Sequence, residues 1–291
     1  MTGASPVLVL HLTGVLQSWG VRSGFTEYRD SAEHPTRSGV LGFLACALGK
    51  PRGSGPEELD QLDLTVRVDR PGTPMEDYHT IGGQTPEEVI PSADGGTRKG
   101  ATLTRRAYLA DAAFTIVLTG PAIVLTQACD ALDRPTYIPF LGRRACPPDA
   151  PFNLGLHSID VEQALRTAPL NRIAPRDRDT VTVDVISTVN PGDPAATHTL
   201  NDNPRNGRRF AQRTLARTTL TLPAGLCTGA DPSDRYTALH NFRHPEAASP
   251  PVAFAAASRR AAVRKPPTAS PPTIHPLAAD SGHDPFALLG W

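Results

Sequence analysis

Apolar and polar positions divide the first half of this 291-residue chain into strands and helices. Residues 7–12 (VLVLHL) are apolar almost throughout and predict a strand. Residues 62–69 (LDLTVRVD) alternate apolar and polar side chains, which is typical of a half-buried strand, and residues 108–118 predict a third strand around the run FTIVL. Between the first two, the segment from Val40 to Leu48 has almost no polar face, so we expect a buried helix there.

Both predicted helices carry end signals. Thr36 or Ser38 can cap the first helix, and Gly49 can end it. Pro121 suits the first position of a second helix over residues 122–132. The side chains of this second helix that we expect to face a sheet are Ile123, Leu125 and Ala128.

The order strand, helix, strand, strand, helix predicts an α+β fold. One more strand would complete a ferredoxin-like arrangement, an antiparallel sheet with two helices on one face. Residues 180–188 and 214–222 are the two candidates for that strand. We therefore predict one domain over residues 1–222, with a long insertion at 78–104 that glycine pairs punctuate. A long excursion from a sheet is more often functional than idle.

The C-terminal part has a different character. Residues 223–291 are expected to form an extension that is largely linker-like, because the segment 245–279 is rich in Pro and Ala. His240 and His244 have the spacing of a metal pair, but no carboxylate lies between them and their flanks look loop-like, so we expect no metal site. The sequence shows no membrane-spanning run and no signal peptide, which predicts a cytoplasmic protein without membrane contact.

Charge is balanced overall but unevenly distributed. The chain has 29 basic and 29 acidic residues, yet three stretches, 97–106, 134–144 and 204–217, contain several arginines and no acids. Since the chain has only three lysines, nearly all of this charge is guanidinium, which binds phosphate bidentately and stacks on bases. The pattern fits RNA, although any single stretch could also be an ordinary solvated face.

Five motifs in chain order suggest a family. They are LQSWG at 16–20, PTRSG at 35–39, DYHT at 77–80, RAYLADA at 106–112 and PFLGRRACP at 139–147. Over residues 5–222 the series resembles the fifth family of CRISPR-associated proteins, of the RAMP superfamily, in its type I-E (CasD) form. The resemblance implies a ferredoxin-like (RRM-like) palm with a β-hairpin thumb, which falls on residues 78–104.

The resemblance also implies a function and partners. It predicts an RNA-binding subunit of a type I-E surveillance complex (Cascade) in antiviral defence, which holds the repeat-derived 5′ handle of a CRISPR RNA. The expected neighbours are the large subunit, the terminal copy of the backbone subunit and, in the assembled complex, target DNA. Residues after 222 lie outside the resemblance.

The expected RNA contacts follow the motifs. Arg37, with Thr36, Ser38 and Gly39, would meet phosphate at a helix start, where capping is the structural alternative. Arg106 and Tyr108 could clamp a base, unless Tyr108 only packs in its strand. Gly142, Arg143 and Arg144 resemble a glycine-rich loop that approaches phosphate closely. Trp19 more often closes a core edge than stacks on a nucleotide. Further candidates are Gln17, Ser18, Trp19, Arg22, Arg29, His79, Arg98, Lys99, Arg105 and Tyr137.

Catalysis is the rival hypothesis. Metal-independent RNA cleavage needs a base, an acid and charge stabilisation, and Tyr78, His79, Lys99 and Arg105 contain these chemical types. A related subtype of the family processes precursor CRISPR RNA in this way, whereas the type I-E form leaves cleavage to a separate subunit. We therefore predict a non-catalytic protein without cofactor, and keep an endoribonuclease and a pure assembly protein as alternatives.

Overall fold

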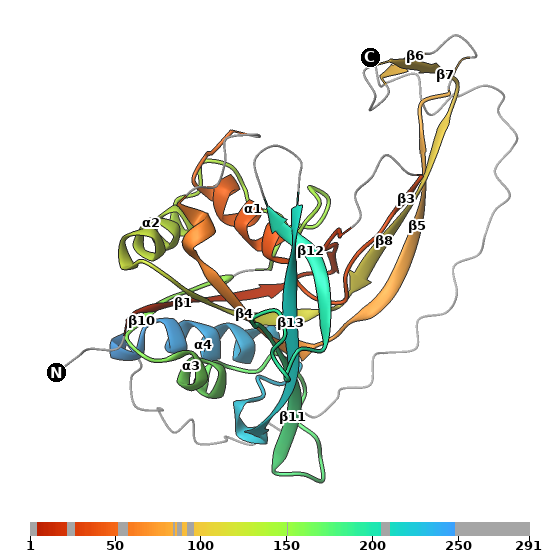
Figure 1. The fold of residues 1–291 in the computed structure, drawn as a ribbon. Coiled ribbons are helices and arrows are strands. Elements are labelled where there is room, and N and C mark those ends of the chain that lie inside the picture. The colour runs from red at the N-terminus through yellow and green to blue at the C-terminus, as the bar shows by residue number, and fades with distance from the viewer. Residues whose placement is uncertain are drawn as a thin grey trace, which may run out of the picture. The chain divides into compact units, whose positions relative to one another are not determined.

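A seven-stranded antiparallel sheet forms the core of the protein (Figure 1). The computed structural model describes residues 5–21, 27–51, 58–83, 85, 89–91, 96–149, 151–204 and 210–247, all within one compact unit, Met1–Ser249. The strand order is β10-β1-β9-β4-β11-β13-β12. The strands are β1 Val7–Thr13, β4 Asp63–Arg70, β9 Ala113–Thr119, β10 Asn153–His157, β11 Thr180–Thr188, β12 His198–Pro204 and β13 Phe210–Pro223.

Helices α1 (Arg37–Ala47) and α2 (Ala122–Asp133) cover one face of this sheet. The predicted ends of α1 are confirmed: Thr36 Oγ1 accepts a hydrogen bond from the Gly39 amide at 3.2 Å, and the amide of Gly49 (φ +71°) donates to the Cys46 carbonyl at 3.1 Å. In α2, Leu125 and Ala128 are buried as expected. The prediction for Ile123 is wrong, since this side chain is 65% exposed.

The closing strand lies elsewhere than predicted. The elements follow the order β1, α1, β4, β9, α2, β10, and β10 pairs with β1 at one end of the sheet. Residues 180–188 and 214–222 are strands, β11 and most of β13, but they extend the sheet on the far side of β4. The sequence pattern does not predict strand β10, because it is only five residues long and contains Gly155 at φ +88°.

The predicted strand over residues 108–118 is two strands. Asp111, at φ +54°, separates β8 (Thr102–Ala110) from β9, which is possible because aspartate tolerates the left-handed region. Strand β8 leaves the main sheet and pairs along its whole length with β5 (Thr73–Ile81), so the two form a long arm (Figure 1). Its tip carries the hairpin of β6 (Val89–Pro91) and β7 (Thr97–Lys99), and β2 (Leu16–Gln17) and β3 (Tyr28–Arg29) pair with β8.

The root of the arm is held by two contacts. Arg70 donates from Nε to the Asp111 carbonyl at 2.6 Å and from Nη2 to Asp111 Oδ1 at 2.7 Å. A Cβ atom on Gly72 (φ +76°) would lie 2.7 Å from Ala112 Cβ. The two connections between the arm and the sheet therefore pack against each other.

The second face of the sheet is also covered, by α3 (Val161–Thr167) and α4 (Pro232–Arg243), which the sequence did not predict. Their buried residues Leu165 and Leu239 join Val9 and Val117 in a second core cluster. The described residues 224–247 thus pack on the domain through α4 and the short 3₁₀ helices Ala224–Leu226 and Pro245–Ala247, and the predicted loop around His240 is helical. The rest of the predicted linker lies outside the described residues.

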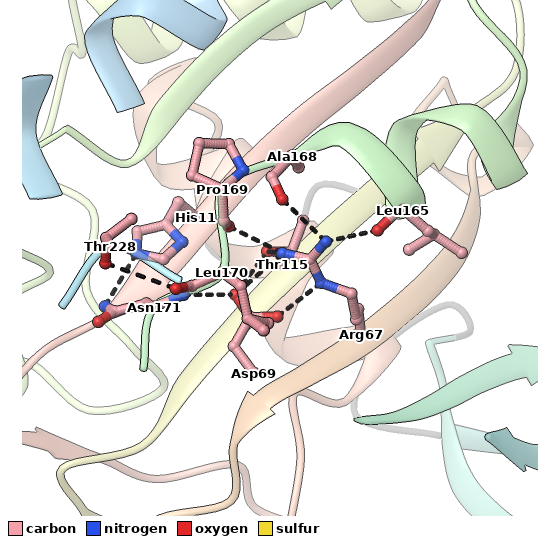
Figure 2. Close-up of polar contacts among 10 residues, drawn as sticks. All are labelled: His11, Arg67, Asp69, Thr115, Leu165, Ala168, Pro169, Leu170, Asn171 and Thr228. Carbon is pink, nitrogen blue, oxygen red and sulfur yellow. Dashed lines mark hydrogen bonds and ion pairs between the residues drawn. The ribbon is translucent and has the colours of Figure 1, made fainter. Parts of the chain in front are cut away.

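Because both faces are covered, the polar side of β4 is buried. The predicted strand is confirmed as β4, but Arg67 and Asp69 are both 0% exposed, so the expected exposure of its polar side is wrong. Arg67 Nε donates to Asp69 Oδ1 at 2.7 Å, and its other nitrogens donate to Thr115 Oγ1 and to the carbonyls of Leu165, Ala168 and Pro169 (Figure 2). This buried cluster fastens the segment after α3 to the sheet.

His11 of β1 lies at the edge of the buried cluster. Its Nε2 is 3.1 Å from Asn171 Nδ2, while Nδ1 has no hydrogen-bond partner among the described residues (Figure 2). Burial lowers the pKa of His11 from 6.5 to about 4. The Asp69 carboxylate raises this pKa in part, and the Arg67 guanidinium lowers it further. His11 is therefore the packed histidine that its position in the strand suggests.

Candidate nucleic-acid interface

A small open pocket lies where the arm meets the domain. It has a volume of about 160 Å³. Strand β3 supplies Arg29, and the loop after α2 supplies Gly142 and Arg143. The lining residues are Ser18, Gly20, Arg29, Asp30, Gly142 and Arg143.

Arg143 is fixed in this pocket by neutral groups. Its Nη1 donates to the Ala107 carbonyl at 3.0 Å and its Nη2 to the Arg29 carbonyl at 3.1 Å. The guanidinium carbon lies 4.5 Å from the centroid of the Tyr108 ring, a cation–π contact. Tyr108 is only 5% exposed, so it supports Arg143, and its predicted role as a base clamp is not favoured.

Gly142 allows the loop to approach the strand exit at Ser18. Its φ is +83°, and a Cβ atom there would lie 1.6 Å from the Ser18 carbonyl oxygen. The Ser18 amide donates to the Leu141 carbonyl at 3.0 Å, and the Ser18 hydroxyl to the Ala107 carbonyl at 3.1 Å. The glycine is thus required for packing against the protein's own backbone, whereas the sequence suggested close approach to phosphate.

Arg29, which lines this pocket, has a further arginine, Arg106, beside it on the neighbouring strand. Arg29 on β3 and Arg106 on β8 are register partners on neighbouring parallel strands, so their side chains extend from the same face. Asp30 is the one carboxylate that lines the pocket, and its Oδ1 accepts from the Val21 amide at 3.2 Å. The arrangement is chemically suited to an anion such as phosphate.

Several predicted contact residues are internal. Trp19 is 0% exposed and donates from Nε1 to Gln17 Oε1 at 3.0 Å. Gln17, also 0% exposed, donates from Nε2 to the Ala112 carbonyl at 2.9 Å. Thr36 is the cap of α1, and its Oγ1 is 3.4 Å from Ser38 Oγ. A Cβ atom on Gly39 would lie 2.7 Å from the Trp19 ring. These residues join α1 to the strand exit and leave little surface for a ligand.

Arg37 does not line the pocket of Arg143. Its amide donates to Asp202 Oδ2 at 2.8 Å, and its Nη2 donates to the carbonyls of Asp60 and Leu62 at 2.7 and 3.1 Å. It borders a different pocket of about 330 Å³, together with Asp60 and Arg213. Burial lowers its pKa, partly offset by Asp60. The helix-start donor that a phosphate would need is already used by a carboxylate.

The residues proposed for cleavage are divided over the arm. Tyr78 and His79 are consecutive on β5, so their side chains point to opposite faces. His79 Nδ1 lies 3.1 Å from Asp77 Oδ2, and Arg105 Nε lies 3.8 Å from Glu76 Oε1. Lys99 belongs to β7 in the tip hairpin. No single face therefore carries the complete set of predicted catalytic groups.

The other predicted arginines differ in their surroundings. Arg144 is exposed, as is Tyr137, but neither lines the pocket of Arg143. Arg98 lies in β7, and Arg22 lies outside the described residues. Of the stretch 204–217, Arg213 is paired with Asp202 at 2.5 Å and Arg217 with Asp184 at 3.0 Å. Arg213 is buried with its partner, whereas Arg217 is 43% exposed and remains a surface charge.

Two pocket residues were missed by the sequence analysis, Gly20 and Asp30. Gly20 ends a quoted motif, which could have drawn attention to it, whereas Asp30 has no local signal. Within the ranges that the structure describes, no group of three or more His, Cys, Asp and Glu side chains could hold a metal ion. None of the described helices has the length and apolar character needed to cross a membrane.

Comparisons with known proteins agree on one family. The family model described as "CRISPR-associated protein (Cas_Cas5)" matches residues 7–216. The chain is 34% identical over 174 residues to the CRISPR system Cascade subunit CasD of Escherichia coli (strain K12), an alignment that covers 54% of this chain and 75% of that protein.

Solved structures that resemble this chain are also CRISPR-associated proteins. One chain of a "CRISPR RNA-guided surveillance complex" matches with a TM-score of 0.70 and 36% identity, covering 81% of this chain and 99% of that one. A "Crystal structure of Cas protein" matches with a TM-score of 0.56 and 28% identity, covering 78% and 100%. The fold and the sequence thus have the same relatives.

Proposed function

The chain belongs to the CRISPR-associated Cas5 family and is a CasD-type subunit, and from this premise we propose that it binds the repeat-derived 5′ handle of a CRISPR RNA without cleaving it. The proposed setting is a type I-E Cascade complex in the cytoplasm. The proposed neighbours are the large subunit, the terminal backbone subunit and, close by, target DNA. The arm suits such a setting, because a two-stranded arm has little core of its own.

In this proposal the domain has a ferredoxin-like palm and the arm is its thumb. Support for the palm comes from the order β1, α1, β4, β9, α2, β10 together with the spatial order β10-β1-β9-β4. Support for the thumb comes from the pairing of β5 with β8, whose outer parts lie in the insertion at 78–104. The pocket of Arg143 then lies where thumb and palm meet.

The observation that carries the proposal is a set of three arginines: Arg29 and Arg143 line this pocket, and Arg106 lies beside Arg29 on the neighbouring strand. Arg29 and Arg106 are register neighbours, and Arg143 is held by carbonyl oxygens and the Tyr108 ring. Among the described residues, Arg106 and Arg143 have no ion-pair partner within 4.0 Å. Guanidinium groups held in place by neutral acceptors are suited to a bent phosphate backbone.

RNA binding to the purified full-length protein tests the proposal. We expect a repeat-derived RNA to bind without being cut, with or without chelator, and the affinity to fall as salt is raised. Arg106→Ala and Arg143→Ala should each weaken binding about tenfold or more, which corresponds to the loss of about 1.5–3 kcal/mol for a hydrogen bond to a charged group. Arg166→Ala is the matched control, since Arg166 is 48% exposed on α3 and pairs with Glu162.

The outcomes separate the three functions. Chelator-resistant cleavage would favour the endoribonuclease, and no binding at any salt concentration would favour a pure assembly protein. Equal affinity of Arg106→Ala, Arg143→Ala and the control for the RNA would show that the binding site lies elsewhere.

A further inference from the structure

The C-terminal end of α4 carries two histidines on one face. His240 and His244 are four residues apart, and the His244 amide donates to the His240 carbonyl at 2.9 Å, so one helical turn separates them. Side chains at this spacing lie one above the other on the same side of a helix. The sequence disfavours a metal pair here because its flanks look loop-like, whereas the structure shows that the segment is helical.

The two imidazole rings have the separation of a chelating pair. Their centroids lie 4.9 Å apart, and the angle between the ring planes is 45°. Two imidazole nitrogens bound to one tetrahedral Zn²⁺ ion at about 2.0–2.1 Å put the ring centroids roughly 5 Å apart. The rings of His240 and His244 therefore need little rearrangement to bind one ion between them.

Tyr236, one turn before His240, restrains the first of these rings. The Tyr236 and His240 rings are stacked, with centroids 6.1 Å apart and an angle of 23° between their planes. A ring that is already held by a neighbour loses less rotamer entropy when it binds an ion. Both side chains lie on the exposed side of α4, where an ion in solution can reach them.

Glu246 favours the tautomer of His244 that a metal ligand needs. Its Oε1 lies 3.7 Å from His244 Nδ1. This distance exceeds that of a hydrogen bond, but the charge of the carboxylate favours a proton on Nδ1. The lone pair of the neutral ring then lies on Nε2, where a metal ion can bind. Metal-bound histidines usually have a carboxylate or carbonyl group at the other ring nitrogen.

The position at the end of the helix also favours a cation. The carbonyl groups of the last turn give the C-terminal end of α4 a partial negative charge. Arg243, which precedes His244, donates from Nη2 to Asp133 Oδ2 at 2.6 Å and from Nη1 to the Asn153 carbonyl at 3.0 Å. Because Asp133 neutralises this guanidinium, it opposes a second positive charge at the histidines only weakly.

We propose that His240 and His244 chelate one divalent transition-metal ion of the class that imidazole prefers, represented by Zn²⁺. Neither histidine lines the pocket of Arg143, so this site goes beyond the proposed RNA binding and does not depend on it. No carboxylate lies between the two histidines, so the general base of the H-E-x-x-H peptidases is missing. With two protein ligands, water completes the coordination. The ion would stabilise the helix end that Arg243 holds against the sheet.

Calorimetric titration of the full-length protein, without an affinity tag, with zinc chloride tests the site. We expect saturable binding. His240→Asn and His244→Asn should each weaken the affinity for Zn²⁺ at least about tenfold, because even the loss of an outer-shell partner changes metal affinity about 10–100-fold. Glu246→Gln should weaken it less than either histidine variant, since it removes only the charge beside His244.

His79→Asn is the matched control. The His79 side chain is 44% exposed, against 40% for His244, and its Nδ1 also faces a carboxylate, at 3.1 Å from Asp77 Oδ2. It lies on a strand, and the residues four positions away are Met75 and Gly83, so it has no second histidine to form a chelate. The affinity of His79→Asn for Zn²⁺ should equal that of the unaltered protein.

Electron paramagnetic resonance of bound Cu²⁺ gives a second measurement, because Cu²⁺ prefers the same imidazole ligands. The unaltered protein should show coupling to two imidazole nitrogens, and His240→Asn and His244→Asn should each show coupling to one. Thermal unfolding gives a third. Zn²⁺ should raise the Tm of the unaltered protein more than that of either variant, because the ion binds the folded pair.

The outcomes distinguish this inference from the proposed function. Absence of saturable binding to the unaltered protein, or equal Zn²⁺ affinity in His240→Asn, His244→Asn and the unaltered protein, would overturn the chelate. Nitrogen couplings to Cu²⁺ that are the same in all three proteins would also overturn it. Repeat-derived RNA should bind both histidine variants as it binds the unaltered protein, and Arg106→Ala and Arg143→Ala should bind Zn²⁺ normally, so each hypothesis can fail while the other stands.

Discussion

Arg67 and Arg143 show how differently one residue type is used in two regions of the same molecule. Both donate to main-chain carbonyls, Arg67 to Leu165, Ala168 and Pro169, and Arg143 to Ala107 and Arg29. Arg67 also has the carboxylate of Asp69 at 2.7 Å and is 0% exposed. Arg143 has the Tyr108 ring instead and opens onto a pocket.

The difference lies in what remains for a ligand. In the buried cluster a carboxylate neutralises the guanidinium, and protein acceptors use its donors, so the charge serves folding alone. At the pocket of Arg143, neutral acceptors fix the orientation of the guanidinium, and no carboxylate among the described residues forms an ion pair with it. Under the proposed function, orientation by carbonyls without neutralisation distinguishes Arg143 from the structural Arg67.

Replacing Arg67, the structural arginine of the two, should have the largest effect on stability. Arg67→Met leaves the Asp69 carboxylate buried without its partner, which should lower the free energy of unfolding by about 3–5 kcal/mol. Urea unfolding followed by circular dichroism measures it. Arg166→Ala, which removes an exposed pair with Glu162, should change the same quantity by less than about 1 kcal/mol, and similar losses in both variants would contradict the reasoning.

Acid should destabilise the fold at His11, beside the buried cluster. The pKa of His11 falls from 6.5 to about 4 on folding, so the folded protein favours the neutral ring. The stability it contributes is present above pH 6.5 and is lost as the pH falls towards 4, by up to about 3 kcal/mol. Burial lowers the pKa of His34 in the same direction.

Unfolding measured at several pH values in this window tests the role of His11. The variant His11→Gln cannot titrate at this position and should show a flatter loss of stability from pH 6.5 to 4, with the remainder coming from other groups such as His34. An unchanged pH profile in His11→Gln would rule out His11 as the main titrating group.

Replacing Gly142 tests whether its contact with Ser18 positions Arg143 at the pocket. Gly142→Ala puts a Cβ atom 1.6 Å from the Ser18 carbonyl oxygen at φ +83°, so the loop and Arg143 must shift. Gly192 also has a positive φ, +88°, but nothing within 4 Å of an added Cβ, so Gly192→Ala should cost only the left-handed strain of about 1–2 kcal/mol. We expect the first variant to lose more stability and also RNA affinity, measured by thermal unfolding and by electrophoretic shift. Equal behaviour of the two glycine variants would show that the contact with Ser18 is unimportant.

Much of the first half of the fold could be predicted from local patterns. The run at Val7, the capped apolar helix ending before Gly49 and the helix after Pro121 each combine periodicity with an end signal. The short strand β10 and the second layer of helices could not be predicted, because five residues with a glycine give no period and α4 has weak amphipathic character. The alternation around Arg67 was misleading, since it indicates two different faces but does not say what covers the polar one.

The candidate site was only partly accessible to such reasoning. Motif resemblance led to Arg106, Gly142 and Arg143, which the structure brings to the root of the arm. The same resemblance also led to Gln17, Trp19 and Arg37, whose hydrogen bonds are made inside the protein. Sequence motifs do not separate residues that build a site from residues that touch its ligand, because both kinds recur together.

The contacts at the root of the arm fix its position on the sheet. Arg70 bonded to Asp111, and Gly72 packed on Ala112, join the arm to the sheet through two short turns in contact. An arm attached in this way is a rigid extension of the sheet and not a flexible one. Under the proposed function, an RNA held at the base of the arm would therefore be contacted farther along the arm at a fixed distance, whatever its sequence.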